Sequence, residues 1–403
     1  MLDYVIDGEW GLRVADDYAE IESIRAAWSQ LQGHQESLHP NGDMDRFISL
    51  VRPHPEAEAP FVLVLSRKGQ PTAILGGYQG NLHLPLKFGY KTLLHQNLRT
   101  VSFVYGAALG SLSGEVCSVL LKGLRRLEGR LGIDLFLFNH LNVEGNLYRA
   151  IRAETPFWRR GSFPRIDLHW QMETPQSVDG FYLSLSKKHR SNIKRDLRKL
   201  EQSHGLRVGR YDTEVLLDEG IRLATGISKK TYQYSLGSGF VDDEWTRSHL
   251  SLSVRRGWLR LYVMFLEDQP AAFQLGLHHQ HTFFLEMCGY DPAWKKLGIG
   301  TALFVKVFEN LCGDPGLSLI DFGFGDASYK MSFGTRHWSE ATSHLFAARP
   351  YPVRVNLLHS GLQGIARAAQ AVVRKVGLEA RIKRRWRDRL QSSDDPSDCQ
   401  DER

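Results

Sequence analysis

The chain has 403 residues, which favours two or three domains, and its 42% apolar and 24% charged residues are typical of a soluble globular protein. The four cysteines form no CxxC pair, which argues against a zinc ribbon, a thioredoxin-like redox pair and a disulfide scaffold, and suits a reducing cytosol. No segment approaches the roughly 20 apolar residues of a membrane-spanning helix, and the N-terminus lacks the features of a secretory signal, so we expect a cytoplasmic protein.

The formal net charge of +6 is concentrated in one segment. Residues 374–390 hold eight basic and two acidic residues, a net of +6, so this segment accounts for the whole excess. One interpretation is a solvated amphipathic helix packed on the body. The other is a peripheral contact with an anionic surface, either lipid at the inner membrane face or nucleic acid. The acidic tail 391–403 is expected to be disordered.

The first half begins with a predicted helix, continues through a predicted strand hairpin, and ends with strands and helices in alternation. A Lys-Gly-Gln-Pro turn separates the two hairpin strands, and a stripe of apolar residues marks the longest helix. In chain order the expected elements are a helix over 19–31, strands over 61–67, 72–80 and 101–107, a helix over 114–131, a strand over 133–138 and a helix over 143–152.

The second half repeats this plan after a basic amphipathic helix. That helix, predicted over 181–202, opens a basic stretch at 187–210, which is either a plain solvated face or a surface that receives a phosphate-bearing ligand. The remaining expected elements are a helix over 215–232, hairpin strands over 259–266 and 271–278, a strand over 281–288, a helix over 300–312, a strand over 317–322 and the start of a helix over 328–333.

The order of hairpin, strand, glycine-flanked helix and strand thus occurs twice, about 186 residues apart. We therefore expect an α/β protein with mixed sheets, built from two tandem copies of one fold. The expected domains are 1–160, a degenerate copy; 161–350, a functional copy; 351–390, a basic amphipathic helical extension; and 391–403, the tail.

The sequence Lys295-Lys-Leu-Gly-Ile-Gly300 lies between an apolar strand and an amphipathic helix. Glycines allow a ligand to approach the backbone, and the first amides of a helix have no internal partner, so this junction predicts an anion site. It contains neither a Walker A motif nor a GxGxxG dinucleotide fingerprint. The first half has only Gly110-Ser-Leu-Ser-Gly114 at the equivalent place, which predicts a copy that shapes an acceptor groove.

The loop at 295–300 resembles the [Arg/Gln]-x-x-Gly-x-[Gly/Ala] loop with which GNAT acetyltransferases bind the pyrophosphate of coenzyme A. Lys295 departs from that pattern, because lysine keeps the charge but loses the bidentate fork. The segment 319–334 resembles the DFxxGxxxYKxxF segment of the CelD-like GNAT type, found around bacterial polysaccharide biosynthesis. The segments 181–197 and 289–294 are similar to the same type, and the tandem layout is similar to that of FemAB transferases.

The resemblance implies direct acyl transfer from a thioester to an amine, without a covalent enzyme intermediate and without a metal. Glu286 interrupts an apolar strand and is the expected general base, Asp321 at a strand end is a second catalytic candidate, and Tyr329 is the expected proton donor to the thiolate. Lys330 and Arg190 are expected to bind the substrate. The residues expected to hold the acyl-CoA are Met287, Cys288, Lys295, Lys296, Gly298, Ile299, Gly300 and Thr301.

Each of these side chains also has a structural interpretation, such as an outward-facing strand carboxylate, a turn residue, a packed aromatic or a surface lysine. Cys288 is not expected to act as a nucleophile, because no motif fixes a histidine beside it. His278, His279 and His281 form a local cluster, but no third metal ligand is evident for the pair that would share a strand face.

Three functions remain open from the sequence. The first is N-acylation of an amine on a sugar, a polysaccharide precursor or a small metabolite, with acetyl-CoA or another acyl-CoA as donor. The second is a FemAB-like transfer from aminoacyl-tRNA to a cell-wall precursor, with tRNA bound by the basic stretch 187–210. The third is a non-catalytic adaptor of polysaccharide biosynthesis. DNA is not an expected partner.

Overall fold

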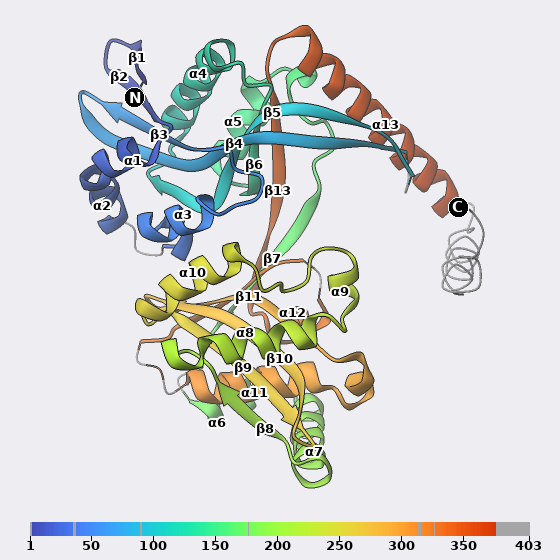
Figure 1. The fold of residues 1–403 in the computed structure, drawn as a ribbon. Helices are drawn as coiled ribbons and strands as arrows, with labels where there is room; N and C mark the ends of the chain where they lie inside the picture. Colours follow the sequence, from blue (N-terminus) through green and yellow to red (C-terminus); the bar gives the residue numbers. More distant parts are fainter. Residues whose placement is uncertain are drawn as a thin grey trace, which may run out of the picture.

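The computed structural model describes residues 2–34, 38–88, 91–175, 177–312, 314, 316–325 and 327–375 (Figure 1). Two lobes are joined through a pair of strands, and a long helix leaves the first lobe at the C-terminal end. The predicted basic segment 374–390 lies outside the described residues from position 376 onward, as does the acidic tail. Within the described part of the chain, no helix is long and apolar enough to cross a membrane.

The first lobe contains two short hairpin strands and three helices before the predicted hairpin. Its elements are β1 (Leu2–Asp7), β2 (Trp10–Ala15), α1 (Tyr18–Ser23), α2 (Arg25–Gly33), the 3-10 turn η1 (Pro40–Gly42), α3 (Met44–Val51), β3 (Ala59–Arg67), β4 (Gln70–Phe88), β5 (Lys91–Gly110), α4 (Gly114–Leu131), β6 (Leu135–Asn142), α5 (Asn146–Glu154) and η2 (Phe157–Arg159).

The second lobe repeats the hairpin, strand, helix and strand order. Its elements are β7 (Ile166–Glu173), α6 (Val178–Ser184), α7 (Lys187–His204), β8 (Arg207–Arg210), α8 (Glu214–Ser228), α9 (Tyr232–Ser235), α10 (Glu244–Arg255), β9 (Leu259–Leu266), β10 (Gln269–His279), β11 (Thr282–Tyr290), η3 (Pro292–Leu297), α11 (Ile299–Leu311), β12 (Leu319–Phe324) and α12 (Ser328–Phe333). The chain then returns to the first lobe through β13 (Arg336–Phe346) and ends its described part with α13 (Pro350–Lys375), which packs on that lobe.

Two predicted helices are interrupted in the structure. The helix expected over 19–31 is two helices, α1 and α2, which are separated at Ile24. The basic helix expected over 181–202 is two helices, α6 and α7, which are separated at Leu185. Ser186 causes the break, because its side chain caps α7 by accepting a hydrogen bond from the His189 amide at 3.3 Å.

All thirteen strands of the described chain form one sheet, in the order β1-β2-β3-β4-β5-β6-β13-β7-β12-β11-β10-β9-β8. Neighbouring strands are antiparallel except for β5 with β6, which α4 connects, and β11 with β12, which α11 connects. The last strand, β13, pairs with β6 of the first lobe and with β7, and β7 pairs with β12 of the second lobe. The two half-sheets are therefore continuous, and the domain boundaries expected at 160 and 350 stay predictions.

Helices cover both faces of each half-sheet. In β3, Phe61, Leu63 and Leu65 pack under α4 and α5, whereas the alternate residues Val62 and Val64 pack under α1 to α3. The second lobe repeats the arrangement, with α7 and α11 on one face of the sheet and α8 and α10 on the other. The mixed α/β fold with two similar halves, expected from the sequence, is thus confirmed.

Candidate functional site

The predicted glycine loop forms an open helix N-terminus. Gly298 precedes α11 in the left-handed conformation, with φ of +66°, and no side chain caps the helix. The Lys295 and Lys296 residues are exposed at the end of η3, and Gly300 is also exposed. A Cβ atom at Gly298 would meet nothing within 4 Å, and one at Gly300 would meet only the Tyr290 ring, at 3.7 Å. The first amides of α11, which include those of Ile299 and Thr301, are therefore accessible to an anion.

Beside this helix, β11 separates from β12. The two strands pair only from Thr282 to Phe284, and β11 then continues along β10 alone. The register between β10 and β11 shifts so that Leu285 and Met287 have partners and Glu286 is the extra residue of a bulge. Met287 and Cys288 therefore lie where one edge of β11 has no neighbouring strand, which leaves room for an extended ligand.

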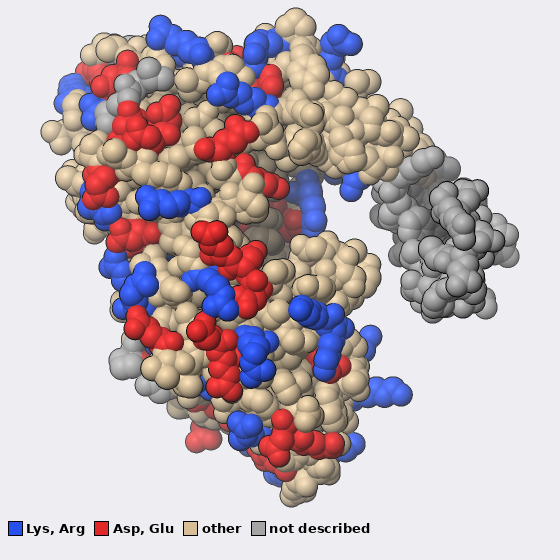
Figure 2. All heavy atoms as spheres, viewed as in Figure 1, with Lys and Arg blue, Asp and Glu red and all other residues tan. Residues whose placement is uncertain are grey.

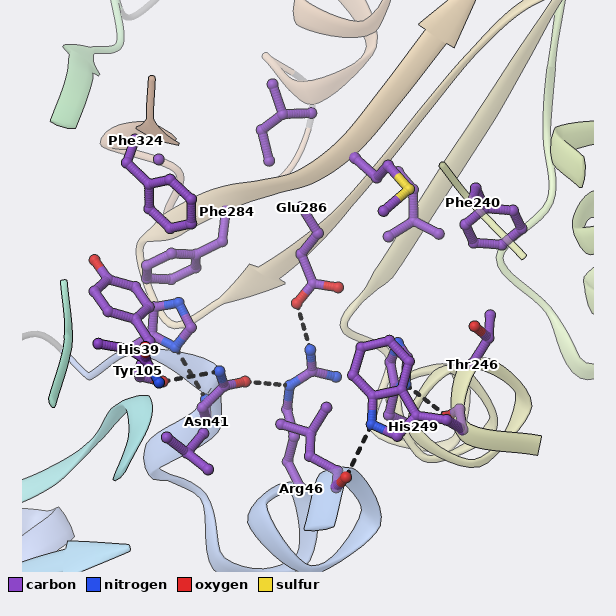
Figure 3. Close-up of a pocket in the computed structure, with 18 of the residues that line it drawn as sticks. His39, Asn41, Arg46, Tyr105, Phe240, Thr246, His249, Phe284, Glu286 and Phe324 are labelled. Carbon is purple, nitrogen blue, oxygen red and sulfur yellow. Dashed lines mark hydrogen bonds and ion pairs between the residues drawn. The ribbon is translucent and has the colours of Figure 1, made fainter. Parts of the chain in front are cut away.

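A cavity of about 660 Å³ lies between the two lobes, and its close-up is shown in Figure 3. The first lobe contributes η1, α3 and β5 to its wall, and the second lobe contributes α10, β11 and β12. Its polar lining residues include His39, Asn41, Arg46, Tyr105, His169, His249, Glu286, Asp321 and Lys330. The structure thus brings Glu286, Met287, Asp321 and Lys330, all predicted from the sequence, to one cavity.

Glu286 meets a buried arginine from the other lobe. Arg46 on α3 is 2% exposed, and its Nη2 donates to the Glu286 carboxylate in a short ion pair. Its Nε donates to Asn41 Oδ1 and its Nη1 to Ser253 Oγ, both at 2.9 Å, so the guanidinium is held on three sides. The Glu286 side chain stays one-quarter exposed and points toward Arg46 in the cavity (Figure 3).

His249 on α10 lines the same cavity. Its Nδ1 lies 2.7 Å from the Trp245 carbonyl oxygen, so Nδ1 carries the proton and Nε2 is left as an acceptor. Burial lowers the pKa of His249 to about 4, and the charge on Arg46 acts in the same direction. His249 is therefore a neutral acceptor next to the Arg46–Glu286 pair.

Asp321 belongs to a buried ionised cluster at the junction of the lobes. His169 Nε2 donates to its carboxylate at 2.7 Å, as do Gln171 Nε2 at 2.6 Å and the Gly323 amide at 2.7 Å. Burial opposes ionisation of Asp321, but the hydrogen bond and charge of His169, with the other donors, outweigh it and lower the pKa. Asp321 is therefore an ionised carboxylate in the cavity wall.

His169 also carries a charge. Its Nδ1 lies 3.2 Å from the buried Glu340 carboxylate of β13, and the Trp338 ring stacks on it at 4.3 Å. Burial lowers the pKa of His169, but hydrogen bonds to Asp321 and Glu340 outweigh this effect and raise the pKa to about 9. An imidazolium on β7 thus links carboxylates on β12 and β13, the two strands that flank β7 in the sheet.

Tyr329 lies against the free edge of β11. Its hydroxyl is 3.9 Å from Cys288 Sγ, and its ring meets Phe322 edge to face. Burial raises the pKa of both Tyr329 and Cys288, so at neutral pH the phenol and the thiol keep their protons. The phenol can therefore donate a proton, and the thiol lacks the ionised form of a nucleophilic cysteine.

The two predicted substrate-binding cations have different positions. The buried Lys330 donates from Nζ to the Phe324 carbonyl at 2.6 Å in the cavity wall. Arg190 lies on α7 and donates to the Tyr182 carbonyl at 3.3 Å, away from the residues that line this cavity. Both assignments to substrate binding stay predictions.

Each histidine of the predicted cluster has a polar contact with a neighbouring residue. His278 lies 3.2 Å from Asp314, His279 lies 3.1 Å from the Leu38 carbonyl, and His281 lies 3.0 Å from the Gly316 carbonyl. Among the described residues, the one group whose ligand atoms lie close enough together for a metal ion is Asp16, Asp17 and Glu20, an acidic cluster at the start of α1.

Several cavity residues were not found from the sequence. Arg46, His169 and His249 come from three segments that no spacing rule connects, and each is recognisable only by its neighbours in space. One local signal existed: Arg46 lies between the apolar Met44 and Phe47 on the buried side of α3 and interrupts its apolar character. A buried arginine needs an anionic partner, which could have prompted a search for one.

Comparisons with known proteins agree with this fold. Residues 187–331 match a family described as acetyltransferase (GNAT) domain. The fold is similar to that of FemX, at 10% identity and a TM-score of 0.54, over 83% of this chain and 98% of that structure. It is also similar to a tandem GNAT protein from the clavulanic acid biosynthesis pathway, at 11% identity and a TM-score of 0.51, over 84% of this chain and 99% of the other. No curated protein matches the sequence. The chain therefore has the fold of these tandem GNAT proteins, and its residues 187–331 match the GNAT acetyltransferase domain.

Proposed function

We propose that the protein is an acyl-CoA-dependent N-acyltransferase that transfers an acyl group directly to an amine. The observation that carries this proposal is the contiguity of three features in the second lobe: an uncapped helix N-terminus, a strand edge without a partner, and a cavity with a carboxylate at the strand bulge. The resemblance of 319–334 to the CelD-like type favours a sugar, a polysaccharide precursor or a small metabolite as the acceptor.

The donor pyrophosphate is assigned to the start of α11. The open amides from Ile299 to Thr301 provide donors for phosphate oxygens, and the exposed Lys295 and Lys296 add positive charge. The free edge of β11 at Met287 and Cys288 is assigned to the pantetheine arm. The donor supplies a thioester acyl group, and these residues orient it toward the cavity.

The acceptor amine is assigned to the cavity, next to Glu286. The Glu286 carboxylate takes the proton that the amine loses as the C–N bond forms. The neutral His249 Nε2 can accept a hydrogen bond from the same amine and hold it toward Glu286.

Tyr329 is assigned to the leaving group. Its protonated phenol lies beside Cys288 on the strand edge where the thioester would lie, so it can donate a proton to the thiolate as the C–S bond breaks. One proton therefore leaves the amine to Glu286 and one reaches sulfur from Tyr329, which balances the reaction without a covalent enzyme intermediate.

Calorimetry with acetyl-CoA tests this function, with the Gly300→Glu variant as comparison. Because a Cβ at Gly300 has room, the variant should fold, but its carboxylate would repel the pyrophosphate from the helix start. We expect micromolar binding by the wild type and none by the variant, followed by thiol release with a panel of amines that includes amino sugars. A folded wild type that binds no acetyl-CoA would contradict the proposal. Binding of charged tRNA would then favour aminoacyl transfer, and binding of neither would favour the adaptor.

A further inference from the structure

Exposed apolar side chains gather on α13 and on the far end of the β4–β5 hairpin. On α13, Leu358 is 56% and Ile365 is 58% exposed, and Leu357 is also exposed. Residues 358 and 365 are seven apart, with the exposed Gly361 between them, so they share one face of the helix. In Figure 2 this part of the surface is mostly uncharged, whereas both lobes carry mixed acidic and basic side chains.

The opposite face of α13 is fixed to the first lobe. Val355 packs in a buried cluster with Leu84 and Leu98 of the hairpin. The fully buried Asn356 donates to the carbonyls of Phe157 and Arg160, at 3.2 and 3.1 Å. The helix therefore cannot roll its apolar stripe inward, and the stripe stays on the surface.

The hairpin continues the apolar surface. Leu86 and Leu94 are register partners and lie on the same face as Leu84. Leu86 is buried, but Leu94 and Phe88, nearer the end of the hairpin, are 45% and 46% exposed. The helix packs along β4, and both elements extend from the body in the same direction in Figure 1.

The charge of the following sequence identifies the partner. Residues 374–390 begin with the last two residues of α13, continue beyond it in sequence and carry the whole net charge of the chain, with Trp386 among the arginines. We infer that α13 and the hairpin end form a docking surface for an anionic lipid bilayer, and that the positive charge of the sequence that follows attracts this surface to the lipid. Apolar side chains enter the boundary between headgroups and acyl chains, and lysine and arginine meet the lipid phosphates.

Other partners fit these observations less well. A nucleic acid would be attracted by the charge, but its phosphate backbone offers no apolar environment for Leu358, Ile365 and Phe88. A second copy of the chain could cover the apolar stripe, but it would bring two segments of net charge +6 together. A lipid surface accounts for both the apolar and the basic component.

Sedimentation with vesicles tests the inference on the full-length chain. The probes are vesicles of phosphatidylcholine alone and of phosphatidylcholine with phosphatidylglycerol. We expect binding only to the anionic vesicles, with release at high salt and a blue shift of tryptophan emission on binding. The Leu358→Glu/Ile365→Glu variant should bind at least about tenfold more weakly. The matched control, Leu183→Glu/Val215→Glu, changes two exposed apolar residues of the other lobe and should bind like the wild type.

The named outcomes separate the possible partners. Failure of the wild type to bind anionic vesicles, or equal loss in the test and control variants, would overturn the inference. Conversion of a dimer to a monomer by Leu358→Glu/Ile365→Glu, without vesicle binding by the wild type, would assign the stripe to a second copy. Binding of tRNA that is insensitive to this variant, again without vesicle binding, would assign the basic segment to nucleic acid. None of these outcomes depends on acyl transfer.

Discussion

The helices α4 and α11 occupy the same place in the two halves, between parallel strands, but their first turns differ. In α4 the Ser113 hydroxyl accepts a hydrogen bond from the Val116 amide at 3.3 Å, so the helix is capped by its own chain. In α11 the residue at that position is Gly298, which offers no side chain. The amides at the start of α4 are thus partly occupied by a side-chain cap, whereas those at the start of α11 are available to an anion.

The glycines near these helices show the same difference. A Cβ atom at Gly110, before α4, would collide with the Thr72 carbonyl oxygen, so this glycine allows two backbone segments to approach. Gly298 faces open space instead, and Gly300 has only a loose contact. A glycine that nothing crowds, at an uncapped helix start, is the better indication of a ligand site.

The first half nevertheless contributes to the proposed chemistry. Arg46 reaches from α3 to the carboxylate of Glu286, and His39 and Tyr105 line the cavity wall. The first half therefore lacks the open anion site but completes the proposed acceptor cavity of the second half.

The largest expected effect comes from comparing a carboxylate variant of the second half with one of the first half. Glu286→Gln removes the proposed base and should lower kcat/KM for the amine acceptor about a thousandfold. Affinity for acetyl-CoA in calorimetry should not change, because the pyrophosphate site is intact. The control Glu115→Gln, at the start of α4, should leave both quantities unchanged. Equal rates for Glu286→Gln and the wild type would remove Glu286 from the mechanism.

The link between the halves should depend on pH through His169. Its pKa is raised from an ordinary 6.5 to about 9 in the folded protein, so the folded state holds this proton more tightly than the unfolded state. Its stabilisation is therefore complete below about pH 6.5 and is lost as the pH rises through about 9. From this shift, the loss should be about 3 kcal/mol.

Urea unfolding of the wild type and His169→Gln, near pH 6 and near pH 10, measures this effect. The difference in unfolding free energy between the two proteins should shrink between these pH values. A constant difference would mean that His169 is neutral in the folded protein.

A matched pair of glycine variants tests the comparison of the two helices directly. Gly300→Glu should weaken acetyl-CoA binding by at least about a hundredfold, which corresponds to about 2.7 kcal/mol. Gly114→Glu places the same side chain at the start of α4, where a Cβ also has room, and should leave the affinity unchanged. Similar losses in both variants would mean that each half binds the donor. Thermal unfolding of both proteins checks that they fold.

The smallest expected effect concerns the cap of α4. Ser113→Ala removes the hydroxyl that satisfies the Val116 amide and should lower the free energy of unfolding by about 1 kcal/mol. Donor affinity should stay at the wild-type value, because this helix start lies in the half without the open loop. An effect on affinity, rather than on stability, would contradict the assignment of separate roles.

The sequence predicted the repeated part of the fold well. Apolar periodicity located α4 and α11 within a residue or two, and the two hairpins were visible from their turns. The strands β7 and β13 were missed, because buried polar residues such as His169 and Glu340 break their apolar pattern. His169 and Glu340 form an ion pair with each other between neighbouring strands, and no pattern along a single strand reveals such a pair.

What the sequence determined by itself is local: amphipathic helices, the turn residues, the uncapped glycine start of α11, and a carboxylate within an apolar strand. What only the tertiary structure decided is which charges meet. Arg46 and Glu286 are 240 residues apart in the chain, and His169 and Asp321 are 152 apart. Ionic contacts act over a few ångströms in space, so their partners follow from the order of strands in the sheet and not from spacing along the chain.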